Sequence, residues 1–304
     1  MVNYMKKIYC ILLSAMLYAG VANAQNDFSL NEQLFSRIAI NPAGTGNSAN
    51  VNIFTLGRFQ YAGMEGSPYT ALLNVHGYIE NASSGVGLSV SYDKSGIAYH
   101  QVQAKAVYAY HLNFGKHNIF SFGVGLGIVN KEFDPSKHRF PDPSSLDPDY
   151  FRYQNKTVFD ASFGIEYANP YILLGVSVNH IPGFFMERTT LNTAPAYYAY
   201  ARGMIKCSDF FSIAPAAAYY FTGQFHVADI SATGFLGKYV YVGLGYKTET
   251  TAYAMVGFEW NWLRIGYAFD ANFGKLSNVA WTSHEIMLSF NISTKRGEDN
   301  KWIY

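Results

Sequence analysis

The stretch LRIGYAFDANFGKLSNVAWTSHEIMLSFNIS, residues 263–293, decides the fold. Near its end, Ile286, Leu288 and Phe290 alternate with mostly polar neighbours. This is the two-residue period of a β-strand with one apolar face. Residues 263–270 show the same alternation, and residues with turn propensity separate the two segments. The pattern therefore predicts an antiparallel hairpin.

A lone hairpin cannot bury a face this apolar, so either neighbouring strands supply a core or a lipid bilayer covers the face. The same alternation recurs along the chain, for example at Val86 and Leu88 and again at Phe122, Val124 and Leu126. The residues between them are largely glycine and serine, whereas the solvent face of a soluble sheet is richer in Lys and Glu. The pattern favours an all-β, transmembrane antiparallel β-barrel over a soluble β-sandwich.

Residues 1–24 have the features of a secretory signal peptide. Two lysines precede the apolar run 8–21, and the sequence Ala-Asn-Ala ends at Ala24, which predicts cleavage before Gln25. A retained membrane anchor is the less favoured alternative, because the run is shorter than the about 20 residues of a spanning helix.

Composition bounds the class of function. A formal net charge of +1 with 14% charged residues gives no indication of nucleic-acid binding. Cys10 lies in the predicted signal peptide and Cys207 is then alone, so we expect no intrachain disulfide. Aromatic residues make up 17% of the chain, and no apolar run of spanning length follows the signal. These features are typical of outer-membrane barrels, whose aromatic girdles mark the membrane interfaces.

Residues 25–50 show no strand alternation and end in the turn sequence Asn41-Pro-Ala-Gly-Thr-Gly46. We expect a short helical or irregular lead-in, and hypothesise that it folds into the lumen as a plug. Residues 51–293 are expected to form the barrel, and residues 294–304 a periplasmic tail. Within the barrel we predict about 14 strands, a number in the range of single-chain outer-membrane barrels. The predicted segments are 51–62, 67–79, 84–94, 97–112, 117–131, 156–168, 170–181, 194–206, 209–222, 224–235, 238–248, 251–260, 262–271 and 281–293.

Loop lengths test this count independently of hydropathy. If both ends of the barrel lie in the periplasm, connections from odd to even strands face outside the cell and the others are short turns. The long connections, residues 132–155, 182–193 and 272–280, all fall on the outside by this parity. The inner turns, such as residues 168–170 and 236–238, are short.

The sequence gives little support for calcium binding, nucleotide binding or hydrolysis. The acidic, proline-containing loop around residues 134–149 has oxygen ligands for calcium, but its spacing matches no ligand loop and favours a solvated loop. The glycines of Gly123–Gly127 alternate within a strand, so they provide room inside the barrel rather than a nucleotide-binding turn. The histidines are scattered and no Gly-x-Ser-x-Gly sequence occurs, which argues against a hydrolase. We therefore expect no catalytic residue, no cofactor and no metal.

Charged residues at inward-facing strand positions are the more informative set. Both signs are present, which favours ion pairs that tie the lumen together over a field that selects one ion. The predicted lumen network comprises Arg58, Asp93, Lys105, Asp160, Glu166, Lys247, Glu259, Arg264, Asp270 and Glu285.

Several short sequences occur in the order and spacing of a known family. They are the Asn41–Gly46 turn, Arg58-Phe-Gln-Tyr-Ala-Gly63, Gly66-Ser-Pro-Tyr-Thr70, Gly85-Val-Gly-Leu88 with Asp93 and Gly96, Gly266-Tyr-Ala-Phe-Asp270 and Ser283-His-Glu-Ile286. Together they resemble the PorP/SprF family of type IX secretion system membrane proteins. The chain departs from the family pattern at Tyr61, where Trp is usual, at Ser67, where Ala is usual, and in the residues that follow Asn41-Pro42.

The resemblance implies an outer-membrane barrel that supports the secretion or surface attachment of proteins with a C-terminal sorting domain, in gliding or protein-secreting bacteria. It implies binding, with no bond made or broken, and partners among secreted proteins and periplasmic or lipoprotein components of the system. On that account the external segments 132–155 and 182–193 would contact the partner. The residues concerned are Asp134, His138, Arg139, Asp142, Asp147, Asp149, Phe184, Phe185 and Arg188. The alternative is a plugged channel for small or hydrophobic solutes.

Overall fold

The structure is a computed structural model that describes residues 30–47, 51–115, 117–135, 153–186, 193–223, 225–237, 239–274, 277 and 281–292. The predicted cleavage site at Ala24 and Gln25 and the predicted tail 294–304 lie outside these residues. Most of the acidic loop also lies outside them.

Fifteen strands form one continuous antiparallel sheet in the described part of the chain. Their bounds are β1 Val51–Phe59, β2 Tyr69–Ile79, β3 Ser84–Ser95, β4 Tyr99–Phe114, β5 Asn118–Phe133, β6 Gln154–Ala168, β7 Ile172–Asn179, β8 Ala196–Gly203, β9 Ile205–Lys206, β10 Phe211–Thr222, β11 Phe225–Leu236, β12 Val240–Lys247, β13 Thr251–Trp260, β14 Leu263–Asn272 and β15 Thr282–Ile292.

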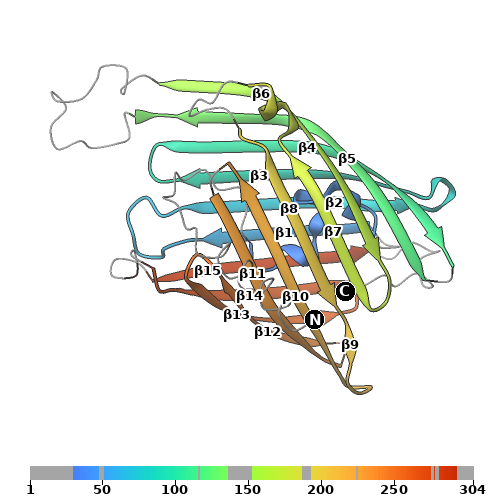
Figure 1. Ribbon diagram of the computed structural model, residues 1–304. Coiled ribbons are helices and arrows are strands. Elements are labelled where there is room, and N and C mark those ends of the chain that lie inside the picture. The colour runs from blue at the N-terminus through green and yellow to red at the C-terminus, as the bar shows by residue number, and fades with distance from the viewer. Residues whose placement is uncertain are drawn as a thin grey trace, which may run out of the picture.

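The sheet closes on itself. The first strand, β1, pairs with both β2 and the last strand β15, and the circuit continues through every neighbour to the β10–β11 pair. The two-residue β9 continues β8 beyond Met204 and pairs with the same partner, β10. β8 and β9 therefore count as one strand of the barrel wall. The result is the 14-strand antiparallel barrel that the sequence predicts (Figure 1).

Side chains alternate between the two faces as the period-two pattern requires. On β5 the outward residues Val124, Leu126 and Ile128 are 44%, 52% and 53% exposed, whereas inward Ser121 and Val129 are buried. An apolar outer band on a closed barrel is stable in lipid, where every backbone group must be paired within the protein. The barrel is therefore a transmembrane one. None of the helices among the described residues is long and apolar enough to cross a membrane.

The wall is uneven in height. β4, β5 and β6 contain 16, 16 and 15 residues, whereas β7 and β8 contain eight each. In Figure 1 the β4–β6 part extends well past the ends of β7 and β8. We call the rim of the barrel that carries the β5–β6 and β7–β8 connections the loop end. We call the opposite rim the turn end.

Residues 30–47 lie inside the ring of strands (Figure 1). They contain three short 3-10 helices, η1 Gln33–Phe35, η2 Arg37–Ala39 and η3 Pro42–Gly44. The sequence explains the last of these, because the Asn41 side chain accepts a hydrogen bond from the Ala43 N–H at 2.9 Å and Pro42 begins the helix. We call residues 30–47 the inner segment.

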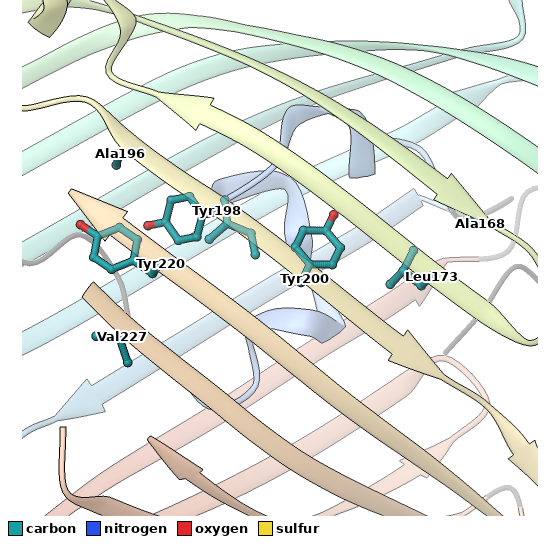
Figure 2. Close-up of a cluster of buried hydrophobic side chains, with 8 residues drawn as sticks. Ala168, Leu173, Ala196, Tyr198, Tyr200, Tyr220 and Val227 are labelled. Carbon is teal, nitrogen blue, oxygen red and sulfur yellow. The ribbon is translucent and has the colours of Figure 1, made fainter. Parts of the chain in front are cut away.

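The inner segment covers apolar patches on the inner wall. Leu30 and Ala39 pack in a cluster with Phe54, Leu56, Leu72, Tyr241 and Met287. Ile40 packs in a second cluster, whose wall residues come from β6–β8, β10 and β11 (Figure 2). The inward face is thus not only glycine and polar residues, as the alternation suggested. Its apolar residues are buried because the inner segment lies on them.

Candidate functional site: the occupied lumen and the loop end

A buried ion pair joins the inner segment to β6. Arg37 Nε donates to Glu166 Oε2 at 2.8 Å, and Arg37 Nη2 donates to Glu166 Oε1 at 3.2 Å. The Tyr200 hydroxyl, from β8, also donates to Glu166. This bidentate geometry is the strong form of an arginine–carboxylate contact, and losing one partner would leave a buried charge uncompensated.

The backbone of the inner segment is hydrogen-bonded to side chains of the wall. Ser177 Oγ and Asn179 Nδ2, both from β7, donate to the Ile40 carbonyl at 2.6 and 3.0 Å. Lys105 Nζ donates to the Ala39 carbonyl at 3.1 Å. His111 Nε2 lies 2.9 Å from the Thr45 carbonyl oxygen. Because these polar side chains satisfy irregular backbone that has no strand partner, the segment has a defined position.

A second charged cluster holds the other end of the inner segment. Arg58 Nη1 donates to Glu285 Oε2 at 3.0 Å and also pairs with Asp270. The backbone N–H groups of Asn31 and Glu32 donate to Glu285 at 3.1 and 2.8 Å. Strands β1, β14 and β15 thus present one cation and two carboxylates to the start of the segment.

Glu32 is the one acidic side chain of the inner segment, and it is buried. The Tyr241 hydroxyl donates to Glu32 Oε1 at 3.1 Å. Burial, followed by the nearby Glu285 carboxylate, raises the pKa of Glu32 to about 8, against the lowering effects of Tyr241 and Arg264. Glu32 is therefore largely protonated at neutral pH.

Phe35 lies between two arginines of different strands. The guanidinium carbons of Arg264 and Arg202 lie 4.8 and 5.4 Å from the centre of its ring, and the ring centroid of Tyr241 lies 4.9 Å away. Cation–π contacts of this kind are stronger when removed from water. Phe35 therefore ties η1 to β8, β12 and β14.

Two inward glycines give the inner segment room. A Cβ atom on Gly123 of β5 would lie 2.1 Å from the Ala43 nitrogen, and one on Gly164 of β6 would lie 2.0 Å from Asn41 Oδ1. The Gly123 clash is with backbone, so only glycine there is compatible with the observed position of η3, whereas a methyl group at residue 164 would displace the Asn41 side chain that caps η3. The glycine run of β5 therefore serves close packing inside the barrel.

The structure brings the ten predicted lumen residues into two kinds of environment. Lys105, Glu166, Arg264, Asp270 and Glu285 contact the inner segment directly. The other five have partners on the wall: Arg58 pairs with Asp270 and Glu285, Asp93 accepts from Thr70, Asp160 from Gln103 and His180, Glu259 pairs with Arg264, and Lys247 lies over the Tyr253 ring.

Sequence reasoning missed several residues that hold the inner segment, and four of them are Glu32, Arg37, Asn41 and Arg202. Arg202 was detectable, because it follows Tyr198 and Tyr200 in strand alternation and so shares their inward face. The other three lie in irregular chain, where no period assigns a face.

At the loop end, Asp134 follows β5 directly, and Phe184 and Phe185 lie in or after η8, the 3-10 helix Ile181–Phe184. Phe185 is 88% exposed, and Phe184 packs its ring 6.3 Å from that of Tyr197. The remaining residues proposed to contact a partner, His138, Arg139, Asp142, Asp147, Asp149 and Arg188, lie outside the described residues.

A small cavity lies beside the inner segment. It is lined by Gln33, Ile40, Tyr198, Tyr220 and Val227, among others, and has a volume of about 20 Å³. This volume accommodates about one water molecule. An aromatic solute does not fit there while the inner segment stays in place.

These features define a class: a bacterial outer-membrane β-barrel whose lumen is occupied by its own N-terminal segment. The sequence signature of the type IX secretion system membrane protein PorP/SprF family matches residues 22–290. The chain therefore belongs to the PorP/SprF family. No curated protein sequence matches it.

Solved structures with this fold include the Ralstonia pickettii toluene transporter TbuX, at 9% sequence identity and a TM-score of 0.52, with 84% of this chain and 93% of that chain covered. The CymD monoaromatic hydrocarbon channel aligns at 11% identity and a TM-score of 0.52, with 92% and 96% covered. A TodX monoaromatic hydrocarbon channel mutant aligns at 11% identity and a TM-score of 0.51, with 88% and 95% covered. At these identities the similarity concerns the fold alone.

Proposed function

We propose that this barrel is a plugged, non-conducting component of the type IX secretion system that binds a secreted protein through that protein's C-terminal sorting domain. The binding supports secretion of the partner or its attachment at the cell surface, as in gliding bacteria. The observation that carries the proposal is the family match, which spans the barrel and the inner segment together.

In this proposal the loop end faces outside the cell, and the turn end, where β1 begins and β15 ends, faces the periplasm. The strands provide a rigid frame, and the segments after β5 and β7 provide specificity. Phe185 is suited to such contact, because a nearly fully exposed aromatic side chain gains free energy when a partner buries it. Periplasmic or lipoprotein components of the system would bind at the turn end.

The contacts of the inner segment support a plug role. Arg37, Asn41 and the Ile40 carbonyl are bonded to β6, β7 and β8, and Asn31 and Glu32 to β15 on another part of the wall. A segment bonded to several parts of the wall braces the barrel and obstructs solute flow. Protease treatment of the membrane-embedded protein should leave residues 30–47 intact; rapid trimming to about residue 50 would contradict the plug.

Deletion of the gene tests the function. We expect one or a few proteins with a C-terminal sorting domain to disappear from the cell surface, while uptake of small solutes stays unchanged. An unchanged set of surface proteins would overturn the proposal.

The second candidate, a channel for small or hydrophobic solutes, has support in the fold shared with hydrocarbon channels and in the apolar clusters inside the lumen. It predicts the opposite outcome of the deletion, with lost solute uptake and intact surface proteins. Passage through the cavity beside the inner segment would require that segment to move, because this cavity is too small for such a solute.

The signal peptide remains part of the proposal. We expect residues 1–24 to be cleaved off during export through the inner membrane, so the mature protein should begin at Gln25. N-terminal analysis of the outer-membrane form, with allowance for cyclisation of the terminal glutamine, checks this.

A further inference from the structure

Among the described residues, β6 is paired along its full length on one side only. All of Gln154–Ala168 pairs with β5. On the other side, β7 pairs only with residues 163–168. β7 ends at Asn179, because His180 adopts a left-handed conformation with φ of 57° and η8 follows. Within the described ranges, no strand lies alongside residues 154–162 on this side.

The direction of the backbone groups follows from the register. The Asn169 N–H donates to the Ile172 carbonyl across the β6–β7 turn, so odd-numbered residues of β6 point their N–H and C=O groups toward β7. The register on the other side of β6 agrees. The Asp134 N–H donates to the Ala98 carbonyl, so even-numbered residues of this part of the chain face the β4 side and odd-numbered residues of β5 face β6. Those odd-numbered residues pair with even-numbered residues of β6, which leaves the odd-numbered residues of β6 directed away from β5. Asn155, Thr157 and Phe159 therefore direct their backbone groups to the open side.

η8 limits the open edge on the side where the β6–β7 pairing begins. It lies beside β6, and His180 Nδ1 is 2.9 Å from Asp160 Oδ1. The edge that is open among the described residues is therefore Gln154–Phe159, with a length of roughly 20 Å at about 3.3 Å per residue. This length matches an ordinary β-strand.

Residues 154–157 of this edge lie in water rather than in lipid, whereas Phe159 pairs with Ile128 at the boundary of the apolar outer band. Residues 154–157 are exposed and polar, and a strand needs only about 9–11 residues to cross a membrane, whereas β6 has 15. Unpaired backbone groups would also be too costly in hydrocarbon. The sequence of the edge, Gln-Asn-Lys-Thr-Val-Phe, contains no proline, so every backbone N–H is present; Lys156 is a charged residue of the kind that limits non-specific pairing at exposed edges.

We propose that this edge of β6, residues 155–159, accepts an extended strand of the secreted partner protein by β-augmentation. The proposal rests on the proposed function and specifies how its partner binds. Main-chain hydrogen bonds to Asn155, Thr157 and Phe159 provide the affinity, and alternating side chains provide the specificity. The edge lies at the same end as Asp134 and Phe185, so one partner contacts both.

The two faces of the edge determine the chemistry of the added strand. Thr157 and Phe159 stand on the outer face, next to Ile128 of β5, and favour β-branched or aromatic neighbours. Lys156 and Asp160 stand on the inner face and favour polar or charged neighbours. The partner strand is therefore one that alternates apolar and polar residues.

Amide hydrogen exchange of the purified protein in detergent tests the open edge directly. The amides of Asn155, Thr157 and Phe159 should exchange quickly. Those of the even-numbered residues Lys156 and Val158, which are bonded to β5, should exchange slowly. Slow exchange at all of these positions in the protein alone would show that its own chain covers the edge, and would overturn the proposal.

Binding tests the partner. The probe is the purified C-terminal sorting domain of the protein that disappears from the surface of the deletion strain. Thr157→Pro removes one outward N–H without touching the β5 ladder, and should weaken binding roughly tenfold or more, because it removes a hydrogen bond and adds a steric block. Thr157→Val keeps the N–H and should bind within about twofold of the unaltered protein. Asn155→Pro provides an independent variant if Thr157→Pro folds poorly.

The outcomes separate the two proposals. If a surface protein is lost on deletion but its sorting domain binds Thr157→Pro and Asn155→Pro as tightly as the unaltered protein, the edge proposal is wrong and the proposed function stands. If no sorting-domain protein is lost, both fail. A dimer of the purified protein that Thr157→Pro dissociates would assign the edge to a second copy of this chain, and would also overturn the proposal.

Discussion

Arg37 and Glu166 form a bidentate ion pair inside the barrel, with nitrogen–oxygen distances of 2.8 and 3.2 Å, although 129 residues separate them in the chain. Tyr200 donates to the same carboxylate. This pair fixes the middle of the inner segment against β6 and β8, and is the contact most open to a quantitative test.

Arg37→Met or Glu166→Gln should each weaken docking of the inner segment by about 3–5 kcal/mol, because each leaves a buried charge or its polar partners uncompensated. Hydrogen exchange of residues 30–47 measures the effect. The double variant should cost clearly less than the sum of the two single changes. Additive costs would mean that the two side chains do not interact in the membrane-embedded protein.

Gly123→Ala and Gly164→Ala should displace the inner segment, because the added methyl groups would overlap the Ala43 nitrogen and Asn41 Oδ1. Limited proteolysis should then cleave within residues 30–47 several-fold faster. Gly57→Ala is the matched control, since its Cβ would meet nothing closer than the Tyr69 hydroxyl at 3.9 Å. Equal cleavage of all three variants would contradict the observed position of η3.

Docking of the inner segment should weaken as the pH rises from about 4.5 to about 8. The pKa of Glu32 is raised from 4.5 to about 8 in the folded protein by burial and by Glu285, so the folded state holds a proton that the released segment loses. The stabilising effect of that proton is complete below about 4.5 and is lost as the pH passes about 8. Hydrogen exchange of residues 30–47 between pH 5 and 9 measures this.

Glu32→Gln is the control for this pH dependence. It keeps the size and polarity of the side chain but cannot ionise, so the slope between pH 5 and 8 should largely disappear. The charged groups that face Glu32, Glu285 of β15 and Arg264 of β14, remain in this variant. A slope that persists unchanged would assign the effect to another group.

Leu126→Arg should reduce folding into lipid vesicles, with a cost of about 2–4 kcal/mol for a charge near the middle of the bilayer. Leu126 is 52% exposed on the outer face of β5, at mid-strand. Asn155→Arg places the same charge near the loop end of β6, beyond the expected lipid, and should fold normally. The shift of the folded band on unheated gels reports the yield, and equal yields would argue against lipid contact at Leu126.

Much of the wall was predictable because strand formation is a local property. The alternation of Leu263, Ile265 and Tyr267, and again of Ile286 and Leu288, assigns faces without knowledge of any neighbour. The prediction missed one detail, the break at Met204 that separates β9 from β8, because nothing in the local alternation marks it. The uneven height of β6 and β7 also depends on register between distant strands.

The lumen was only half predictable. Period two placed Glu166, Asp270 and Glu285 on the inner face, but it could not pair Glu166 with Arg37 or Glu285 with the backbone of Asn31 and Glu32. Those contacts join an irregular segment to strands more than a hundred residues away. Whether the lumen network contributes to partner binding or only to stability stays a prediction.

The sequence by itself determined that the chain is a membrane barrel of about 14 strands, because side-chain alternation and turn residues are read within a few positions. Only the tertiary structure decided how the inner segment docks in the barrel and which strand edge lacks a neighbour among the described residues. Both depend on closure of the sheet, which brings residues 30–47 against inward glycines and carboxylates of distant strands and ends β7 before it can cover β6. Contacts of that range have no local period, so no pattern in the sequence specifies them.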